Sequence, residues 1–285
     1  MALSPKQYLA CSLLAKTSVD AAVFRLDFEW PGPAPGAGQF FMVRALRGGS
    51  FLGRPLSVYR RDHGLSFLIQ KKGRGTTELS QLEPGEQAAL TGPLGNKWKD
   101  FIPGAETPAP ADKAGTPGKI ALVGGGVGIA PLAALAAELG GGFDFYAGFR
   151  SRPFGLESLE EKADLLLIAS EDGIGGRRGR IPDFFTAENY RAVCACGPEP
   201  MLRALADQCG KAGVPCYISM ERRMACGAGA CLGCAVTTAA GNRRCCADGP
   251  IFPAGDVFFE APPNSGLPSE ERRAGPAFKK EEKAP

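Results

Sequence analysis

Short runs of β-branched and aromatic residues, interrupted by proline and glycine, characterise the first hundred residues of the chain. Such runs occur at positions 22–30, 39–44, 65–71 and 88–91. Runs of this length and composition, bounded by turn-forming residues, are typical of β-strands. Many short strands at nearly regular spacing predict a small antiparallel β-barrel over residues 1–103.

The pattern changes at residue 119, where apolar runs begin to alternate with segments of helical periodicity. The apolar runs lie at 120–123, 143–149, 165–169 and 192–196, and the helical segments lie at 131–139 and 201–212. Alternating strands and helices predict a parallel sheet with the topology of a dinucleotide-binding domain. We therefore expect a β plus α/β fold, with the α/β domain over residues 119–218.

Three further segments differ in composition. Residues 104–118 are rich in Pro, Ala and Gly, which predicts a linker or surface loop. Residues 219–260 are rich in Cys and Gly, which predicts a small C-terminal domain. Residues 261–285 carry charges of both signs and several prolines, which predicts a disordered tail.

Composition and charge argue against several classes of protein. The net charge is only +3, with no basic stripe, so nucleic-acid binding has little support. Residues 119–149 are weakly polar, but glycines and Pro131 interrupt them, which favours a strand, a turn and a short helix over a membrane span. The N-terminus shows no signal peptide. We expect a cytoplasmic protein whose ten cysteines are reduced.

The C-terminal cysteines have a recognisable spacing. Cys226, Cys231 and Cys234 form a C-x4-C-x2-C pattern, as in plant-type ferredoxins, where a distant cysteine completes a [2Fe–2S] site. Intervening glycines let the backbone turn and direct N–H groups at sulfur. Zinc is disfavoured because the second pair, Cys245 and Cys246, is adjacent, and neighbouring residues rarely both reach one metal.

Spacing alone leaves the fourth ligand open between Cys245 and Cys246. Adjacent side chains point in opposite directions in an extended chain, so only one of the two is expected to face the cluster. The other is then an ordinary small side chain.

A second candidate site lies in the predicted barrel, in the sequence GRPLSVYR at 53–60. Arg54 has the planar fork that suits a diphosphate, and Ser57 could offer its hydroxyl to a flavin ring. Gly75 and Thr76 could provide backbone N–H groups and a hydroxyl for phosphate, at the start of a helix. The competing interpretation is a surface arginine and a simple turn.

A third candidate site follows the first strand of the α/β domain. Its glycines are placed for close approach to a diphosphate, and a later turn, CGPEPM, would leave room for a nicotinamide ring. Cys196 either packs in the core or lines the hydride-transfer site, and we favour the second. The residues assigned to this site are Gly124, Gly125, Gly126, Gly197 and Pro198.

Together these sequences resemble the electron-transfer subunits of the two-protein (class 1B) dihydroorotate dehydrogenases, within the ferredoxin–NADP reductase family. The resemblance covers roughly residues 8–260. It rests on RPLS, GRGT, LVGGGVGIAPL, SEDGIGGRRGRI and CGPEPML, and above all on MERRMACGAGACLGC followed by CADGPIF. In that family the last cluster ligand lies one residue before Asp-Gly-Pro, which implies Cys246.

The resemblance implies a relay of electrons from dihydroorotate to NAD⁺. Electrons would leave the FMN of a separate catalytic subunit, pass the [2Fe–2S] cluster and reach FAD in this chain, as a step of pyrimidine biosynthesis. The implied assembly is a heterotetramer with two copies of each subunit. The implied FAD contacts are Arg54, Pro55, Leu56, Ser57, Ile69, Gln70, Gly75 and Thr76.

Two alternatives remain open at this point. One is a subunit of another NAD(P)H:ferredoxin-type complex, and Arg150 and Arg152 could bind the 2′-phosphate of NADPH. The other is a non-enzymatic iron–sulfur protein that reuses the flavin fold, which the presence of both RPLS and CGPEPM disfavours.

Overall fold

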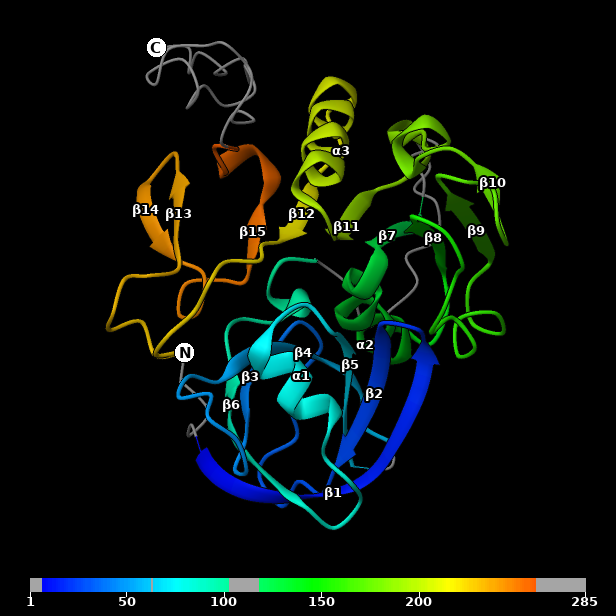
Figure 1. The fold of residues 1–285 in the computed structure, drawn as a ribbon. Coiled ribbons are helices and arrows are strands. Elements are labelled where there is room, and N and C mark those ends of the chain that lie inside the picture. Colours follow the sequence, from blue (N-terminus) through cyan, green and yellow to red (C-terminus); the bar gives the residue numbers. More distant parts are fainter. Residues whose placement is uncertain (1–6, 63, 103–117, 260–285) are drawn as a thin grey trace.

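The strands of the described residues form a closed barrel, a seven-stranded sheet and a two-stranded hairpin (Figure 1). The computed structural model describes residues 7–62, 64–102 and 118–259. Both the antiparallel barrel and the mainly parallel sheet predicted from the hydrophobic pattern are confirmed. The predicted linker, except Gly118, and the predicted tail lie outside the described residues.

The barrel closes six antiparallel strands in the order β1-β2-β5-β4-β3-β6. Phe28, Phe41 and Phe67 are fully buried inside it and pack with tilted or perpendicular rings. A short helix, α1 (Arg74–Ser80), lies between β5 and β6. The strands are β1 (Gln7–Asp20), β2 (Val23–Phe28), β3 (Phe40–Ala45), β4 (Arg54–Arg60), β5 (Leu65–Gln70) and β6 (Gln87–Leu94).

The second sheet has the order β10-β9-β8-β7-β11-β12-β15. Its order along the chain reverses between β7 and β11, which pair in parallel at the centre. Ligands of such sheets bind outside the carboxyl ends of the strands at this reversal. The strands are β7 (Ile120–Gly125), β8 (Phe143–Phe149), β9 (Leu165–Ser170), β10 (Arg177–Arg178), β11 (Ala192–Cys196), β12 (Cys216–Ser219) and β15 (Ile251–Pro253).

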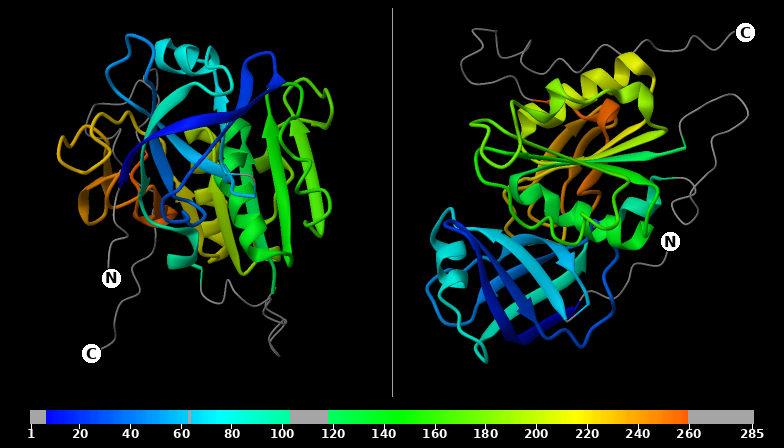
Figure 2. Two further views of the ribbon diagram at one scale, coloured as in Figure 1. Left: turned by 90° about the horizontal axis from the view of Figure 1, so that it is seen from below. Right: turned by 90° about the vertical axis from the view of Figure 1, so that its right-hand side faces the viewer.

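Helices cover the two faces of this sheet (Figure 2). The helix α2 (Ile129–Leu139) lies between the sheet and the barrel, and α3 (Glu199–Ala212) covers the opposite face. Glu138 of α2 accepts a hydrogen bond from the Ala37 N–H at 2.8 Å and pairs with Arg61 at 2.9 Å. The helix therefore fixes the barrel against the sheet. Within the described ranges, no helix is long and apolar enough to cross a bilayer.

The C-terminal segment leaves the sheet and returns to it. After β12 it forms the hairpin of β13 (Ala235–Thr238) and β14 (Gly241–Arg244). It then re-enters the sheet as β15, antiparallel to β12. The cysteine-rich segment is therefore anchored to the sheet at both of its ends.

Candidate functional site

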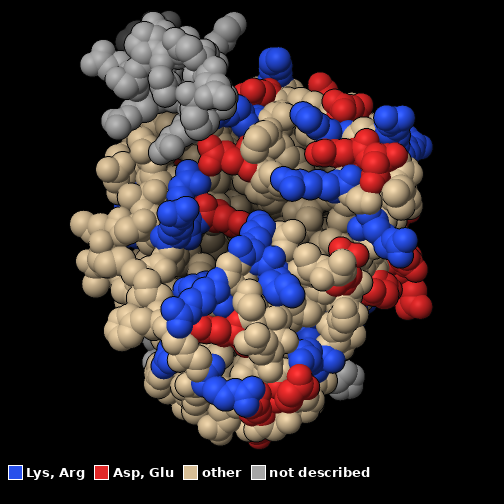
Figure 3. Space-filling view, in the orientation of Figure 1, with Lys and Arg blue, Asp and Glu red and all other residues tan. Residues whose placement is uncertain are grey.

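A cleft of about 910 Å³ opens where the barrel, the parallel sheet and the C-terminal segment meet. Figure 3 shows the molecule hollowed at this level, with Lys and Arg side chains around the opening. Residues from all three regions line the cleft. Of the residues predicted to bind cofactors or act in catalysis, it brings together Arg54, Pro55, Leu56, Ser57, Ile69, Gln70, Thr76 and Cys196.

Arg54 occupies the barrel wall of the cleft at the first position of β4. Its guanidinium passes over Gly75, where a Cβ atom would lie 2.6 Å from the Arg54 Cζ. Only glycine leaves room for this approach. One arm donates to the Leu52 carbonyl at 3.0 Å, which holds the planar fork at the cleft. The arrangement suits recognition of a diphosphate.

The turn before α1 is closed by Thr76. Its hydroxyl accepts hydrogen bonds from the N–H groups of Lys72 and Gly73, at 3.0 and 3.1 Å. The helix begins at Arg74, so Gly75 and Thr76 lie in its first turn. The Thr76 hydroxyl therefore stabilises this turn, while Thr76 and Gly73 also line the cleft.

The glycine-rich turn after β7 packs against the turn after β11. A Cβ on Gly125 would lie 2.6 Å from Pro198 Cδ, and one on Gly197 would lie 2.9 Å from the Gly125 backbone. These glycines let two segments of backbone touch at the point where the sheet reverses. Gly124, Gly125, Gly126, Gly197 and Pro198 are absent from the cleft wall, which is formed there by Val127, Gly128, Ala130 and Pro131.

Cys196 is the last residue of β11 and lines the cleft with only 3% of its surface exposed. Burial raises the pKa of its thiol well above the ordinary value. The side chain is therefore a neutral thiol at physiological pH. It can shape the cleft or donate a hydrogen bond, but it has no thiolate character.

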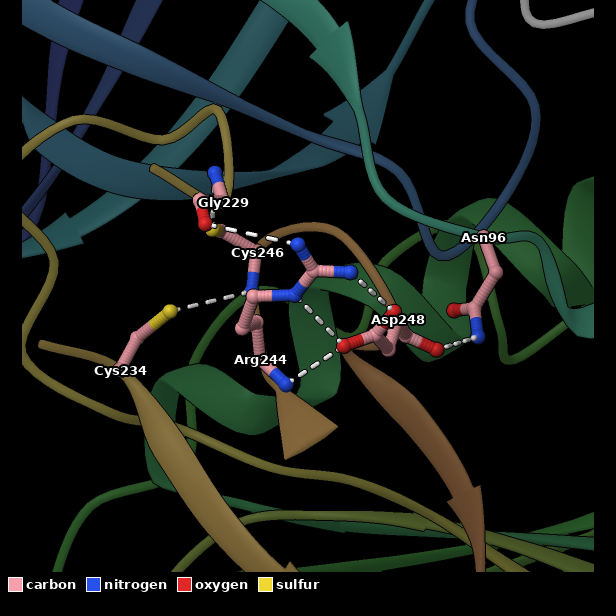
Figure 4. A network of polar contacts seen from close by, with 6 residues as sticks. All are labelled: Asn96, Gly229, Cys234, Arg244, Cys246 and Asp248. Atoms are coloured by element: carbon pink, nitrogen blue, oxygen red, sulfur yellow. Dashed lines mark hydrogen bonds and ion pairs between the residues drawn. The ribbon is translucent and has the colours of Figure 1, made fainter. Parts of the chain in front are cut away.

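The four predicted cluster ligands lie in two pairs. The side chains of Cys226 and Cys231 contact each other, and so do those of Cys234 and Cys246. The Gly229 N–H donates to Cys246 Sγ at 3.1 Å, and the Cys246 N–H donates to Cys234 Sγ at 3.4 Å (Figure 4). Backbone donors aimed at sulfur stabilise negative charge on thiolates.

Backbone hydrogen bonds favour ionisation of Cys226, one of the two cysteines nearer to solvent. Cys226 Sγ accepts hydrogen bonds from the N–H groups of Cys231 and Ala228, at 3.5 and 3.4 Å. These bonds lower the pKa of Cys226 to about 6. The inner pair, Cys234 and Cys246, is buried, and burial raises the pKa of Cys246 to about 12. Cys226 therefore forms a thiolate more readily than Cys246.

A two-and-two arrangement fits a [2Fe–2S] cluster better than a single ion. Each iron of such a cluster takes two protein ligands, whereas a structural zinc ion takes four around one centre. Among the described residues, no group of three or more His, Cys, Asp or Glu side chains is placed to hold one metal ion. The cysteines agree with that result, because they lie as two pairs and not as one group of four.

Cys245 and Cys246 point to opposite sides of the chain. The Cys245 thiol donates to the Met220 carbonyl at 3.0 Å, and its burial raises its pKa to about 12. The Cys246 thiol, by contrast, contacts the Cys234 side chain. This geometry supports Cys246 as the fourth ligand and Cys245 as a packing residue.

A polar network that sequence reasoning missed holds the loop of Cys246 in place (Figure 4). Arg244 and Asp248 form a bidentate ion pair, with both nitrogen–oxygen distances at 2.9 Å. Asn96 of the barrel donates to the carbonyls of Asp248 and Ile251 and accepts from the Ile251 N–H, at 2.9 to 3.1 Å. The Asp-Gly-Pro sequence thus joins the thiol loop to the barrel.

Sequence reasoning also missed residues 219–224, which line the cleft from the end of β12 toward the first cysteine. Met224 lies on the cleft wall, and Cys226 follows two residues later. The available signal was the position of the motif: MERR directly precedes the C-x4-C-x2-C sequence. The chain therefore passes directly from the cleft to the thiols.

Comparisons with known proteins identify relatives of this chain. The iron-sulfur cluster binding domain of dihydroorotate dehydrogenase B matches residues 221–258. A "Dihydroorotate dehydrogenase B (NAD(+)), electron transfer subunit" from Clostridium acetobutylicum is 40% identical over 224 residues, 78% of this chain and 86% of that protein. The subunit of the same name from Caldanaerobacter subterraneus is 36% identical over 255 residues, 87% of this chain and 97% of that protein.

The fold also has a counterpart among solved structures. The structure of an NADH-dependent reduced ferredoxin-NADP oxidoreductase, described for flavin-based electron bifurcation, superposes with a TM-score of 0.70. It is 26% identical in sequence, and the match covers 87% of this chain and 90% of that chain. Most of this chain's fold thus has a counterpart in a solved reductase.

Proposed function

The chain belongs to the family of the electron transfer subunits of dihydroorotate dehydrogenase B (NAD(+)), and from that premise we propose that it passes electrons from a catalytic subunit to NAD⁺. The electrons derive from the oxidation of dihydroorotate to orotate. The cofactors supply the redox chemistry: the cluster carries one electron, nicotinamide takes two as hydride, and a flavin exchanges either number.

One observation carries this proposal: a single cleft is walled by all three parts of the molecule. The RPLS residues, the point where the sheet reverses and the segment leading to the cysteines all border it. A flavin in this cleft would have a nicotinamide site on one side and the cluster thiols on the other. The flavin would thus lie next to both the nicotinamide site and the cluster thiols, as a relay of electrons requires.

We assign the roles of this chain's residues accordingly. Arg54 would hold the FAD diphosphate, Ser57 and Gln70 would contact the flavin, and Cys196 would shape the nicotinamide side of the cleft as a neutral thiol. Gly128 lines the cleft where the sheet reverses, and α2 begins directly after it. Cys226, Cys231, Cys234 and Cys246 would bind the [2Fe–2S] cluster.

The family names imply a separate catalytic subunit, and we propose an FMN-containing dihydroorotate dehydrogenase subunit in a complex of two copies of each chain. No histidine or other base for dihydroorotate is required here, because its oxidation would occur in the partner. Native mass spectrometry of the co-expressed subunits measures the stoichiometry. A complex with one copy of each chain would contradict the heterotetramer.

The direct test is reconstitution of the relay. We expect the purified chain to release FAD on heating and to show iron–sulfur absorbance. With the catalytic subunit, it should support reduction of NAD⁺ by dihydroorotate. A chain that binds no flavin, or a complex that reduces NAD⁺ only with another donor, would contradict the proposal.

The likeness to an NADH-dependent reduced ferredoxin-NADP oxidoreductase supports a second candidate, a subunit of another NAD(P)H:ferredoxin-type complex. Reduced ferredoxin in place of dihydroorotate as electron donor discriminates the two. Initial rates with NADH and NADPH, measured in the reverse direction with an external acceptor, determine the nucleotide preference that Arg150 and Arg152 leave open.

A further inference from the structure

A second cavity, of about 270 Å³, lies between α3, the start of β12 and the end of β15. Figure 1 draws these three elements next to one another in the upper part of the molecule. A water molecule occupies about 30 Å³ in the liquid, so the cavity has room for several small molecules. It shares no lining residue with the cleft, and none of its residues has a role in the proposed relay.

Two cysteine side chains form part of the wall of this cavity. Cys209 lies in the last turn of α3, and Cys216 is the first residue of β12. Cys209 is fully buried, whereas 8% of the surface of Cys216 is exposed. The two thiols are within hydrogen-bonding contact of each other. The cavity therefore leads from solvent to two sulfur atoms that touch.

A short, firmly held turn connects the two cysteines. Residues 210–215 separate them, and Gly213 ends α3 with a φ of 68°. The Val214 N–H donates to the Cys209 carbonyl at 2.9 Å, and the Val193 N–H donates to the Pro215 carbonyl at 2.9 Å. These hydrogen bonds fix the backbone next to each cysteine, so the two sulfurs stay in contact.

A third thiol close by, that of Cys194, is directed away from the pair. Cys194 follows Val193 in β11, and Val193 lies opposite Cys216 in the sheet. Because neighbouring residues of a strand point to opposite faces, Val193 shares the α3 face with Cys216. Cys194 instead packs in the core on the α2 face. Cys209 is therefore the partner that the fold gives to Cys216.

We propose that Cys209 and Cys216 are a redox-active thiol pair, which hydrogen peroxide entering the cavity converts to a disulfide. The Cys216 sulfur attacks one peroxide oxygen, the O–O bond breaks, and a sulfenic acid forms as one water leaves. The Cys209 sulfur then displaces the hydroxyl group, and a second water leaves as the S–S bond forms. The peroxide accepts two electrons, and both thiol hydrogens end in water.

The Cys216 thiol is neutral in the resting protein. Its hydrogen bond with Cys209, and then its burial, raise the pKa of Cys216 well above the ordinary value. A neutral thiol reacts slowly with peroxide, because the thiolate is the nucleophile. We therefore expect the pair to stay reduced under ordinary conditions and to respond to an excess of peroxide.

The disulfide would connect the last turn of α3 to the first residue of β12. The strand β12 has four residues, and its last residue, Ser219, lines the cleft. One covalent bond would thus tie the helix to the strand that leads to the cleft. The bond would form at the end of β12 away from the cluster cysteines, which follow Ser219 along the chain.

The test uses the purified full chain with its cofactors bound. The protein is treated with hydrogen peroxide, denatured in iodoacetamide and digested with trypsin without reduction. Cleavage after Lys211 separates the two cysteines, because Cys209 lies in peptide 204–211 and Cys216 lies in peptide 212–222. Each is the only cysteine of its peptide, so a disulfide is detected by mass spectrometry as a linked pair of peptides.

We expect the linked pair only after peroxide treatment, with iodoacetamide labelling of both cysteines reduced to less than half of the untreated level. Dithiothreitol added after peroxide should restore the labelling. Cys11 is the matched control, because it is buried in β1 and is the only cysteine of peptide 7–16. Its labelling should not change. Cys209→Ser should give no disulfide at Cys216.

Three results would overturn the inference. Full labelling of both cysteines after excess peroxide would mean that the touching thiols only pack the core. A disulfide from Cys216 to another cysteine, or sulfinic acid at Cys216 without the linked pair, would mean that Cys209 is not its redox partner. An equal loss of labelling at Cys11 would mean that peroxide acts on the unfolded chain. The mapping needs no catalytic subunit, so each result leaves the proposed function untouched.

Discussion

The chain has two glycine-rich segments that look alike in sequence and differ in physical use. In the segment 124–128, at the end of β7 and just after it, two glycines have no room for a side chain: a Cβ on Gly124 would lie 2.8 Å from Ile129 Cγ2, and one on Gly128 would lie 2.7 Å from the Cys196 carbonyl carbon. In the cluster loop, Gly227 and Gly229 have positive φ values, 64° and 83°. Gly124 and Gly128 are therefore needed for their small size, whereas Gly227 and Gly229 are needed for their conformational freedom. At Gly227 a Cβ would also lie 2.6 Å from Met42 Cγ.

The difference shows how each segment serves its site. Close packing after β7 brings the ends of β7 and β11 together and leaves Gly128 and Val127 on the cleft wall. Left-handed turns in the cluster loop direct backbone N–H groups toward sulfur, as between Gly229 and Cys246. Glycine content alone therefore indicates a tight backbone, and the contacts decide whether that backbone meets other backbone or a ligand.

The largest expected effect distinguishes the two adjacent cysteines, Cys245 and Cys246. We predict that Cys246→Ser abolishes the visible iron–sulfur absorbance, because its sulfur faces the other ligands. Cys245→Ser should keep nearly all of it, because the hydroxyl can still donate to the Met220 carbonyl. Absorbance spectra and iron content of the purified variants measure this. The reverse result would overturn the ligand assignment.

The close packing around Gly128 can be tested by adding one methyl group. Gly128→Ala should lower the free energy of unfolding by about 1–3 kcal/mol, the usual cost of overpacking, because the Cβ would overlap the Cys196 carbonyl. Gly141→Ala is the control, since nothing lies within 4 Å of its Cβ position. Urea unfolding of both variants measures the difference. Equal stabilities would contradict the packing role of Gly128.

The smallest expected effect concerns a third glycine turn, Gly48-Gly49, which the Glu78 side chain stabilises. The Ser50 hydroxyl, Arg74 and the N–H groups of Gly49 and Ser50 lower the pKa of Glu78 from 4.5 to about 2. Since the folded pKa lies below the ordinary value, this stabilisation is fully present above about pH 4.5 and is lost as the pH falls toward 2.

Glu78→Gln should therefore have a lower Tm than the wild type at pH 7, and the gap should narrow between pH 4.5 and 2. Thermal unfolding followed by circular dichroism across this range measures it. Glu157→Gln, at an exposed carboxylate 3.5 Å from Arg60, is the control and should show little change at any pH. A gap that stays constant with pH would mean that the charge of Glu78 does not stabilise the turn.

Much of the architecture could be predicted from the hydrophobic pattern. The strands β7, β8, β9 and β11 begin at the predicted residues, because continuous apolar runs are typical of buried parallel strands. The helices α2 and α3 begin two residues earlier than predicted, at Ile129 and Glu199. Both predicted starts lay at or just after a proline, which helices accept in their first turn.

The candidate site was only partly predictable. RPLS and the four cysteines are local patterns, and spacing was enough to single them out. Asn96 was missed because its partners, Asp248 and Ile251, lie more than 150 residues away along the chain. No local pattern encodes a contact over that separation.

The amino-acid sequence by itself thus determined the order of the elements, the presence of a cysteine cluster and the sites where glycine tightens the backbone. These follow from periodicity and spacing, which act over a few residues. Only the tertiary structure decided that Gly128 lines the cleft, that Cys246 faces the other cysteines and that residues 219–224 join the cleft to them. Those facts depend on how the barrel packs against the sheet, which arises from contacts between distant parts of the chain.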